Sequence, residues 1–167
     1  EHALAVTRGN YVAHDNLGTE LVRAGRTTEA IGHYERALAI KPDYAYAHNN
    51  LGVVLFRLGR VAEAMAHYER ALRIMPDCAE VHNNLGAALL AQGRQLEAAR
   101  QFEQAVQFKP DFAEAHFNLG TYQLREGQVA EAIGHLEQAL RLSPADDDIH
   151  WNLGVARFQL GEALAAQ

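Results

Sequence analysis

The apolar residues of this chain follow a helical spacing that returns every 34 residues. The unit that begins at residue 45 contains two such stretches, at Leu51, Leu55 and Phe56 and then at Ala64, Tyr68, Ala71 and Leu72. Apolar side chains at this spacing lie on one face of a helix. Each unit is therefore predicted to form two helices that pack against each other as a hairpin.

Glycine and proline mark the ends of the predicted helices. One glycine in each unit falls just past the first stretch, at Gly25, Gly59, Gly93, Gly127 and Gly161. Glycine adopts the positive φ that ends a helix without a steric cost from a Cβ atom. A proline follows the second stretch, at Pro42, Pro76, Pro110 and Pro144, and an aspartate comes next at Asp43, Asp77 and Asp111. These aspartates are predicted to cap the following helix.

A Leu-Gly pair lies inside each predicted first helix, at Leu17-Gly18, Leu51-Gly52, Leu85-Gly86, Leu119-Gly120 and Leu153-Gly154. Glycine inside a helix costs roughly 1 kcal/mol relative to alanine, so close packing of the two helices is its expected role. The register gives units at 11–44, 45–78, 79–112 and 113–146, with a partial unit at 147–167. Residues 1–10 match the tail of a preceding second helix, which predicts a fragment of a longer array.

The repeated template resembles the tetratricopeptide repeat (TPR). It reads His48-x2-Leu51-Gly52-x2-Leu55, then Gly59, Ala64-x3-Tyr68, Ala71 and Pro76, and keeps the landmarks of that signature except the two aromatics of the first helix. The resemblance implies an all-α, right-handed superhelical solenoid of helix-turn-helix hairpins. It also implies that a small residue of the second helix faces the glycine, at Ala30, Ala64, Ala98 and Ala132.

Three residues depart from the template late in the chain. Gln123 replaces a leucine that the first three units carry, Leu136 replaces an aromatic residue, and Arg157 interrupts the apolar row of the last helix. The fourth unit and the partial fifth unit are therefore expected to pack less well than the first three.

Composition excludes several classes of partner. The net charge is −6, and the basic residues are scattered rather than gathered into a stripe, which disfavours nucleic acid. The longest apolar runs are too short to span a membrane, so we expect a soluble protein without membrane insertion. The single cysteine, Cys78, excludes an internal disulfide framework and leaves the compartment open.

The sequence offers little for catalysis. Ser143 is the only serine, it precedes Pro144, and no glycine-rich phosphate loop is present, so we expect neither an enzyme nor a bound cofactor. Histidine recurs once in each first helix, at His14, His48, His82, His116 and His150. Neighbouring helix axes lie about 8–10 Å apart, too far for these rings to share a metal with ligand bonds of about 2 Å, so no metal is expected. His33, His67 and His135 are expected on the outer face in contact with water.

One asparagine precedes each Leu-Gly pair, at Asn16, Asn50, Asn84, Asn118 and Asn152. The family resemblance places this position on the concave face. With helices about 8–10 Å apart and about 3.3 Å per residue of extended chain, one asparagine would meet every third residue of a bound peptide. The neighbouring positions add further candidate peptide-binding residues, Asn49, Asn83, Phe117 and Trp151, with the two aromatics as anchors. Rim candidates for an acidic ligand are Arg23, Arg57 and Arg125.

The segments 47–52 and 115–120 are similar to repeats of O-linked N-acetylglucosamine transferases, whose asparagine ladder grips extended polypeptide. These features favour a non-catalytic protein–protein interaction module that binds an extended peptide or a helix of a partner protein in its concave groove. Two alternatives stay open. One is a self-association scaffold in which exposed array ends join copies into a homo-oligomer, and the other is a substrate-docking segment of a larger glycosyltransferase.

Overall fold

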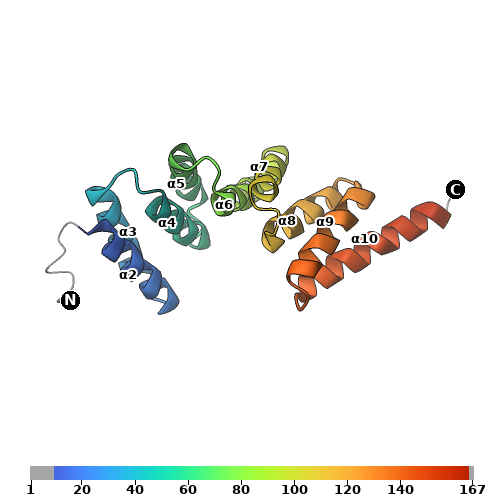
Figure 1. The fold of residues 1–167 in the computed structure, drawn as a ribbon, viewed down its shortest axis with the longest axis horizontal. Coiled ribbons are helices and arrows are strands. Elements are labelled where there is room, and N and C mark those ends of the chain that lie inside the picture. The colour runs from blue at the N-terminus through green and yellow to red at the C-terminus, as the bar shows by residue number, and fades with distance from the viewer. Residues whose placement is uncertain (1–9, 166–167) are drawn as a thin grey trace.

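Residues 10–165, which the computed structural model describes, form an elongated row of helical hairpins and contain no strand (Figure 1). The first helices of the hairpins are α2 (Tyr11–Arg23), α4 (Ala45–Arg57), α6 (Ala79–Ala91) and α8 (Ala113–Arg125). The second helices are α3 (Thr27–Ile40), α5 (Val61–Ile74), α7 (Gln95–Phe108) and α9 (Val129–Leu142). A longer helix, α10 (Asp147–Ala165), completes the row. Within residues 10–165, none of the helices has the length and apolar content needed to cross a membrane.

The hairpins stack so that their first helices line one side of the array. Each first helix packs most extensively on its own second helix, and it also contacts the next first helix along the chain, as α4 contacts α6 and α6 contacts α8. Successive second helices make no contact of similar extent within the described residues. The first helices therefore lie closer together and form the concave side of the solenoid.

In the first three hairpins, an aromatic ring fills the space that the interior glycine of the first helix leaves open. A Cβ atom built on Gly52 would lie 2.6 Å from the ring of Tyr68, and one on Gly86 would lie 2.5 Å from the ring of Phe102. Both rings are almost completely buried. The ring, rather than the small residue of the second helix, is thus the nearest neighbour of the glycine, which corrects the expectation for the first three units.

The predicted turns form in four units and fail in the fifth. Gly25, Gly59, Gly93 and Gly127 each have φ between 73° and 77° and end the first helix as expected. Gly161 instead lies inside α10, which continues to Ala165, so the helix end predicted at Gly161 is wrong. The residues that follow, Glu-Ala-Leu-Ala, are strong helix formers, and within residues 10–165 no further helix packs against α10 there to stabilise a turn. The helical tail expected at 1–10 falls almost entirely outside the described residues.

The predicted aspartate caps are also wrong. The N-cap residues of α4, α6 and α8 are Tyr44, Cys78 and Phe112, and their side chains make no capping bond in the described structure. A side-chain cap forms where this same position carries a short polar residue. Asn10 Oδ1 accepts from Ala13 N at 3.0 Å, and Asp146 Oδ1 accepts from Asp148 N at 3.0 Å. The capping residue is thus one position later than the sequence suggested.

The fourth unit carries two buried polar atoms without partners. In the first unit, the Thr19 hydroxyl lies 3.2 Å from the hydroxyl of Tyr34. Leu136 replaces that tyrosine in the fourth unit, so the equivalent hydroxyl of Thr121 is buried with no hydrogen bond among residues 10–165. The Oε1 atom of Gln123 is buried and unpaired as well within that range. Unpaired polar atoms of this kind lower stability. The looser packing expected of this unit is not seen, because α8 and α9 pack as extensively as the other helix pairs and Leu136 is completely buried.

Histidine pairs connect the two helices of three hairpins. His48 Nδ1 lies 2.9 Å from His67 Nδ1, and His48 Nε2 lies 3.0 Å from the carbonyl oxygen of Pro42. A carbonyl only accepts, so His48 Nε2 carries the hydrogen and Nδ1 of the neutral ring accepts from His67. The same pairing joins His14 to His33 and His116 to His135. The second-helix histidines are therefore bonded across the hairpin, which corrects the expectation that they face water alone.

We predict that Gln123→Leu raises the free energy of unfolding by about 1 kcal/mol, because it removes the unpaired Oε1 and restores the leucine of the other units. Urea denaturation followed by circular dichroism measures the change. Gln159→Leu, at an exposed position of α10, makes the same substitution without removing a buried polar atom and should change stability little. A loss of stability in Gln123→Leu would contradict this account of the fourth unit.

Acid should weaken the histidine-linked hairpins. Burial lowers the pKa of His48 and of His67, and the neighbouring ring of His48 lowers the pKa of His67 further. The folded state then binds fewer protons than the unfolded state, so this stabilisation is complete above about pH 6.5 and is lost as the pH falls below it. We predict a lower urea midpoint at about pH 5.5 than at about pH 7.5, on either side of the usual histidine pKa.

His67→Gln should reduce this pH dependence, because it removes one titrating ring and recreates the pair that the third unit already uses, His82 with Gln101 at 2.7 Å. His150→Gln is the matched control, since His150 is exposed and its ring bonds the backbone oxygen of Pro144. If His67→Gln kept the full dependence of the unsubstituted protein, the pairs would not be its source.

Candidate functional site

The asparagine row of the first helices forms a hydrogen-bond ladder between hairpins. Three rungs have the same geometry, with the amide nitrogen donating to a side-chain oxygen of the preceding first helix. They are Asn50 Nδ2 to Asp15 Oδ1 at 3.0 Å, Asn84 Nδ2 to Asn49 Oδ1 at 2.9 Å and Asn118 Nδ2 to Asn83 Oδ1 at 2.9 Å. Each rung joins residues 35 positions apart, so the ladder links neighbouring units along the concave side.

Two of the ladder acceptors are enclosed by the array. Asn83 is 1% exposed, and Asp15 is 6% exposed. Burial raises the pKa of Asp15, and the hydrogen bond from Asn50 opposes that rise. Asn83 was expected on the peptide-binding surface, but its side chain lies between α6 and α8 with Oδ1 bonded to Asn118. Its burial leaves no surface for a ligand, so we exclude Asn83 from the candidate site.

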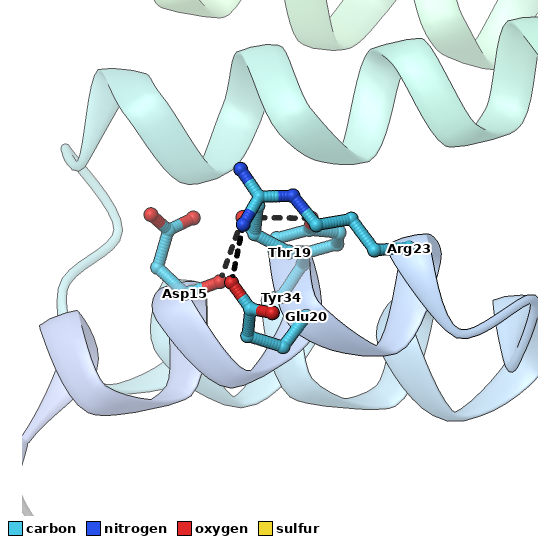
Figure 2. A network of polar contacts seen from close by, with 5 residues as sticks. All are labelled: Asp15, Thr19, Glu20, Arg23 and Tyr34. Carbon is cyan, nitrogen blue, oxygen red and sulfur yellow. Dashed lines mark hydrogen bonds and ion pairs between the residues drawn. The ribbon is translucent and has the colours of Figure 1, made fainter.

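The first rung is supported by a polar network on α2 (Figure 2). The backbone oxygen of Asp15 accepts a hydrogen bond from the Thr19 hydroxyl, which also meets Tyr34 of α3. One helical turn further along, Arg23 forms an exposed ion pair with Glu20 at 2.6 Å. Arg23, a rim candidate, therefore already has an acidic partner within its own helix.

The ladder changes at its C-terminal end. Phe117 occupies the acceptor position of α8 and offers no side-chain oxygen to α10. Asn152 instead donates to the backbone oxygen of Asp148 in its own helix, at 2.8 Å. A rung is thus replaced by an aromatic side chain at the junction of α8 and α10.

This junction borders a hollow of about 350 Å³. Its lining residues come from α6, α8 and α10, from the first residue of α7 and from the turn after α8: Leu90, Gln95, Phe117, Asn118, Thr121, Tyr122, Arg125, Glu126, Asp148 and Asn152. Pockets of a few hundred Å³ with apolar walls and a few polar groups are typical binding sites. The structure thus brings together four of the residues selected from the sequence, namely Phe117, Asn118, Asn152 and Arg125.

The other selected residues lie outside this hollow. Trp151 is 73% exposed and occupies the position on α10 that Asp15 and Asn83 occupy on α2 and α6. The next first helix covers those two residues, whereas α10 is the last described helix. Asn16 and Arg57 are also exposed, and Asn49 borders a smaller hollow of about 130 Å³ with Tyr46 and Cys78.

The sequence analysis missed one group of residues and gave a second group the wrong role. It did not select Tyr122 and Glu126, which line the larger hollow beside Arg125. It also took Asn49 and Asn83 as ligand contacts, although the structure makes them acceptors of the ladder. The sequence did contain a signal for the ladder. In the first three units, the residue directly before the repeated asparagine has a side-chain oxygen, whereas in the fourth unit that residue is Phe117.

Comparison with solved structures finds similar solenoids. The structure of YrrB, described as a TPR protein with an unusual peptide-binding site, superimposes with a TM-score of 0.77 at 23% identity over 93% of this chain and 80% of that chain. The MamA protein gives 0.76 at 20% identity, over 90% and 82% of the two chains. PilF of Pseudomonas aeruginosa gives 0.83 at 28% identity, over 92% and 70%.

Family models identify the repeats themselves. No curated protein matches the chain. A model described as tetratricopeptide repeat matches residues 16–77, and a second, described as TPR repeat, matches 88–125 and 123–161. Together these matches cover more than half of the 167 residues, and with the all-helical solenoid they show that the chain belongs to the tetratricopeptide repeat family.

Proposed function

We propose that this chain is a protein-interaction module whose concave face binds an extended segment of a partner protein. The observation that carries the proposal is the hollow of about 350 Å³ between α8 and α10, where Asn118 and Asn152 lie beside Phe117 and Tyr122. TPR proteins are generally non-catalytic interaction modules. YrrB, a structural neighbour, is described as having a peptide-binding site.

The ladder prepares the asparagines for a backbone ligand. An Asn side chain has two N–H donors and one carbonyl oxygen, and a rung uses one of the donors. Asn118 therefore keeps Oδ1 and a second N–H, the two groups that a peptide unit needs for its own N–H and C=O. Because the rung already fixes the amide, binding loses less side-chain freedom than it would with a mobile residue.

The hollow provides selectivity that the asparagine row lacks. Phe117 and Tyr122 offer apolar surface for one large side chain of the ligand, while Arg125 and the acidic residues Glu126 and Asp148 lie around it. Charges of both signs at one hollow favour a segment with an apolar residue flanked by polar or charged residues. A uniformly charged ligand would meet repulsion on one side.

The two alternatives from the sequence remain predictions. Self-association would use surfaces such as Trp151 and Phe158, which are 73% and 66% exposed on α10. Light scattering over a range of concentrations separates this alternative from a monomeric binding module. The resemblance to the repeats of O-linked N-acetylglucosamine transferases would place the same peptide-binding face beside a catalytic domain, and the mode of binding proposed here serves that role equally.

A pair of alanine variants tests the concave face. Asn118→Ala and Asn83→Ala break the same rung, but Asn118 lines the hollow and Asn83 is buried. Peptides selected from a proteome-derived display library should bind Asn118→Ala about 2- to 13-fold more weakly than the unsubstituted protein, the equivalent of about 0.5–1.5 kcal/mol for one hydrogen bond. Asn83→Ala should weaken binding by a smaller factor, because it removes the rung that orients the Asn118 amide but leaves the groups of Asn118 that contact the ligand.

Arg125→Glu provides a second probe of the hollow, and Arg141→Glu, which lines a different hollow, is its control. Only the first reversal should alter which peptides are selected. If no peptide is selected, or if Asn118→Ala binds as tightly as Asn83→Ala, the concave face is not the binding surface.

A further inference from the structure

A second hollow, of about 520 Å³, lies between α8 and α9 on the side of α8 that carries the histidine pair of the fourth unit. Its lining includes His116 and His135, whose Nδ1 atoms are 3.0 Å apart, together with Glu131 and Gln123. We propose that this pair binds a divalent transition-metal ion of the Zn²⁺, Cu²⁺ or Ni²⁺ type through the two Nδ1 atoms. Imidazole nitrogen is a preferred ligand of these ions.

The geometry of the pair is close to that of two metal ligands. Two nitrogens bound to one tetrahedral zinc at about 2.0–2.1 Å are about 3.3 Å apart. The observed 3.0 Å would have to open by a few tenths of an ångström, with each ring tilting so that its lone pair points at the metal. Gly134, beside His135, leaves open space there, since a Cβ built on it would meet nothing within 4 Å.

The ring of His116 is already in the form that a metal requires. Its Nε2 lies 3.0 Å from the backbone oxygen of Pro110, so Nε2 donates and Nδ1 presents its lone pair across the hairpin. Metal-bound histidines commonly donate the other ring N–H to a carbonyl oxygen in this way. His135 would move its hydrogen from Nδ1 to Nε2, and both rings would then be neutral ligands.

Charge distinguishes the fourth unit from the other units with histidine pairs. Arg26 and Arg60 pair with Glu29 and Glu63 in the first two units, whereas Gln128 holds that position in the fourth and Glu131 has no cationic partner there within the described residues. Glu131 lies one helical turn from His135, on the same face of α9.

A second arginine is also missing. Arg70 of the second unit lies near enough to His48 to repel a cation, and Gln138 replaces it in the fourth. Arg141, which also lines the hollow, remains and bonds Gln138. The fourth unit therefore offers a cation two ring nitrogens, a carboxylate at the same hollow and fewer arginines than the second unit.

The protein's metal ligands come from the histidine pair alone. No group of three or more His, Cys, Asp or Glu side chains suited to a metal is found within residues 10–165, so the protein supplies two nitrogens and water completes the coordination.

Zinc titration of tag-free protein by calorimetry tests the proposal, with His135→Gln as the key variant. This substitution recreates the His82–Gln101 pair of the third unit, so the hairpin keeps a hydrogen bond, which thermal denaturation without metal verifies. The tightest Zn²⁺ site should weaken by about 10- to 100-fold, at least the loss seen when outer-shell partners of metal ligands are removed. Glu131→Gln should weaken it by a smaller factor.

His67→Gln makes the same change in the second unit and should leave the tightest site intact. Anomalous scattering from crystals soaked in Zn²⁺ should place the ion between His116 and His135. No binding to the unsubstituted protein, unchanged binding in His135→Gln, equal losses in His135→Gln and His67→Gln, or an ion located elsewhere would each overturn the assignment.

Discussion

The contact between a glycine of the first helix and a ring of the second sets the geometry of this array. At Gly52 the ring of Tyr68 occupies the volume of a side chain, and any Cβ there would lie 2.6 Å from it. The glycine costs roughly 1 kcal/mol of helix propensity, which burial of a whole aromatic side chain offsets. Because the ring fixes how closely the two helices approach, it also fixes where the next hairpin can stack. In the fourth unit Leu136 takes the place of the ring, and the rung of Asn118 and the histidine pair form there too.

The proposed function gives the ladder asparagines two roles, in stability and in binding. An asparagine that donates sideways to the preceding helix supports the stack, and the same bond holds its remaining donor and acceptor toward the concave side. Occurrence of asparagine in every unit therefore does not separate the two roles. Burial does separate them, since Asn83 is enclosed whereas Asn118 borders a hollow. In the proposed function, the ligand contacts the side-chain groups of the ladder that the rungs leave free and exposed.

Periodicity was sufficient to predict the hairpins, because a 34-residue spacing leaves few ways to bury the apolar stripes. Periodicity failed where contacts between helices, rather than the repeated sequence, determine the local structure. Gly161 has the sequence of a turn but lies within α10, and no further helix of the described residues packs there to stabilise a turn. The histidine pairs were missed for a related reason. His48 and His67 are 19 residues apart, and only the crossing of the two helices brings their Nδ1 atoms to 2.9 Å.

The substitutions at Gln123 and Leu136 affect mainly the fourth unit, because the units of a solenoid are nearly independent. Each unit contacts only its neighbours, so an unpaired polar atom in one hairpin destabilises that hairpin and leaves distant ones unaffected. The buried core is continuous from Leu21 to Leu119, and a separate cluster around Leu136 serves the last hairpins. The unpaired polar atoms of Thr121 and Gln123 therefore lower the stability of the fourth unit alone. Helix α8 of this unit lines both hollows. If a ligand in one hollow shifted α8, it would change the affinity of the other hollow for its ligand. By linkage, the second ligand would change the affinity for the first by the same factor.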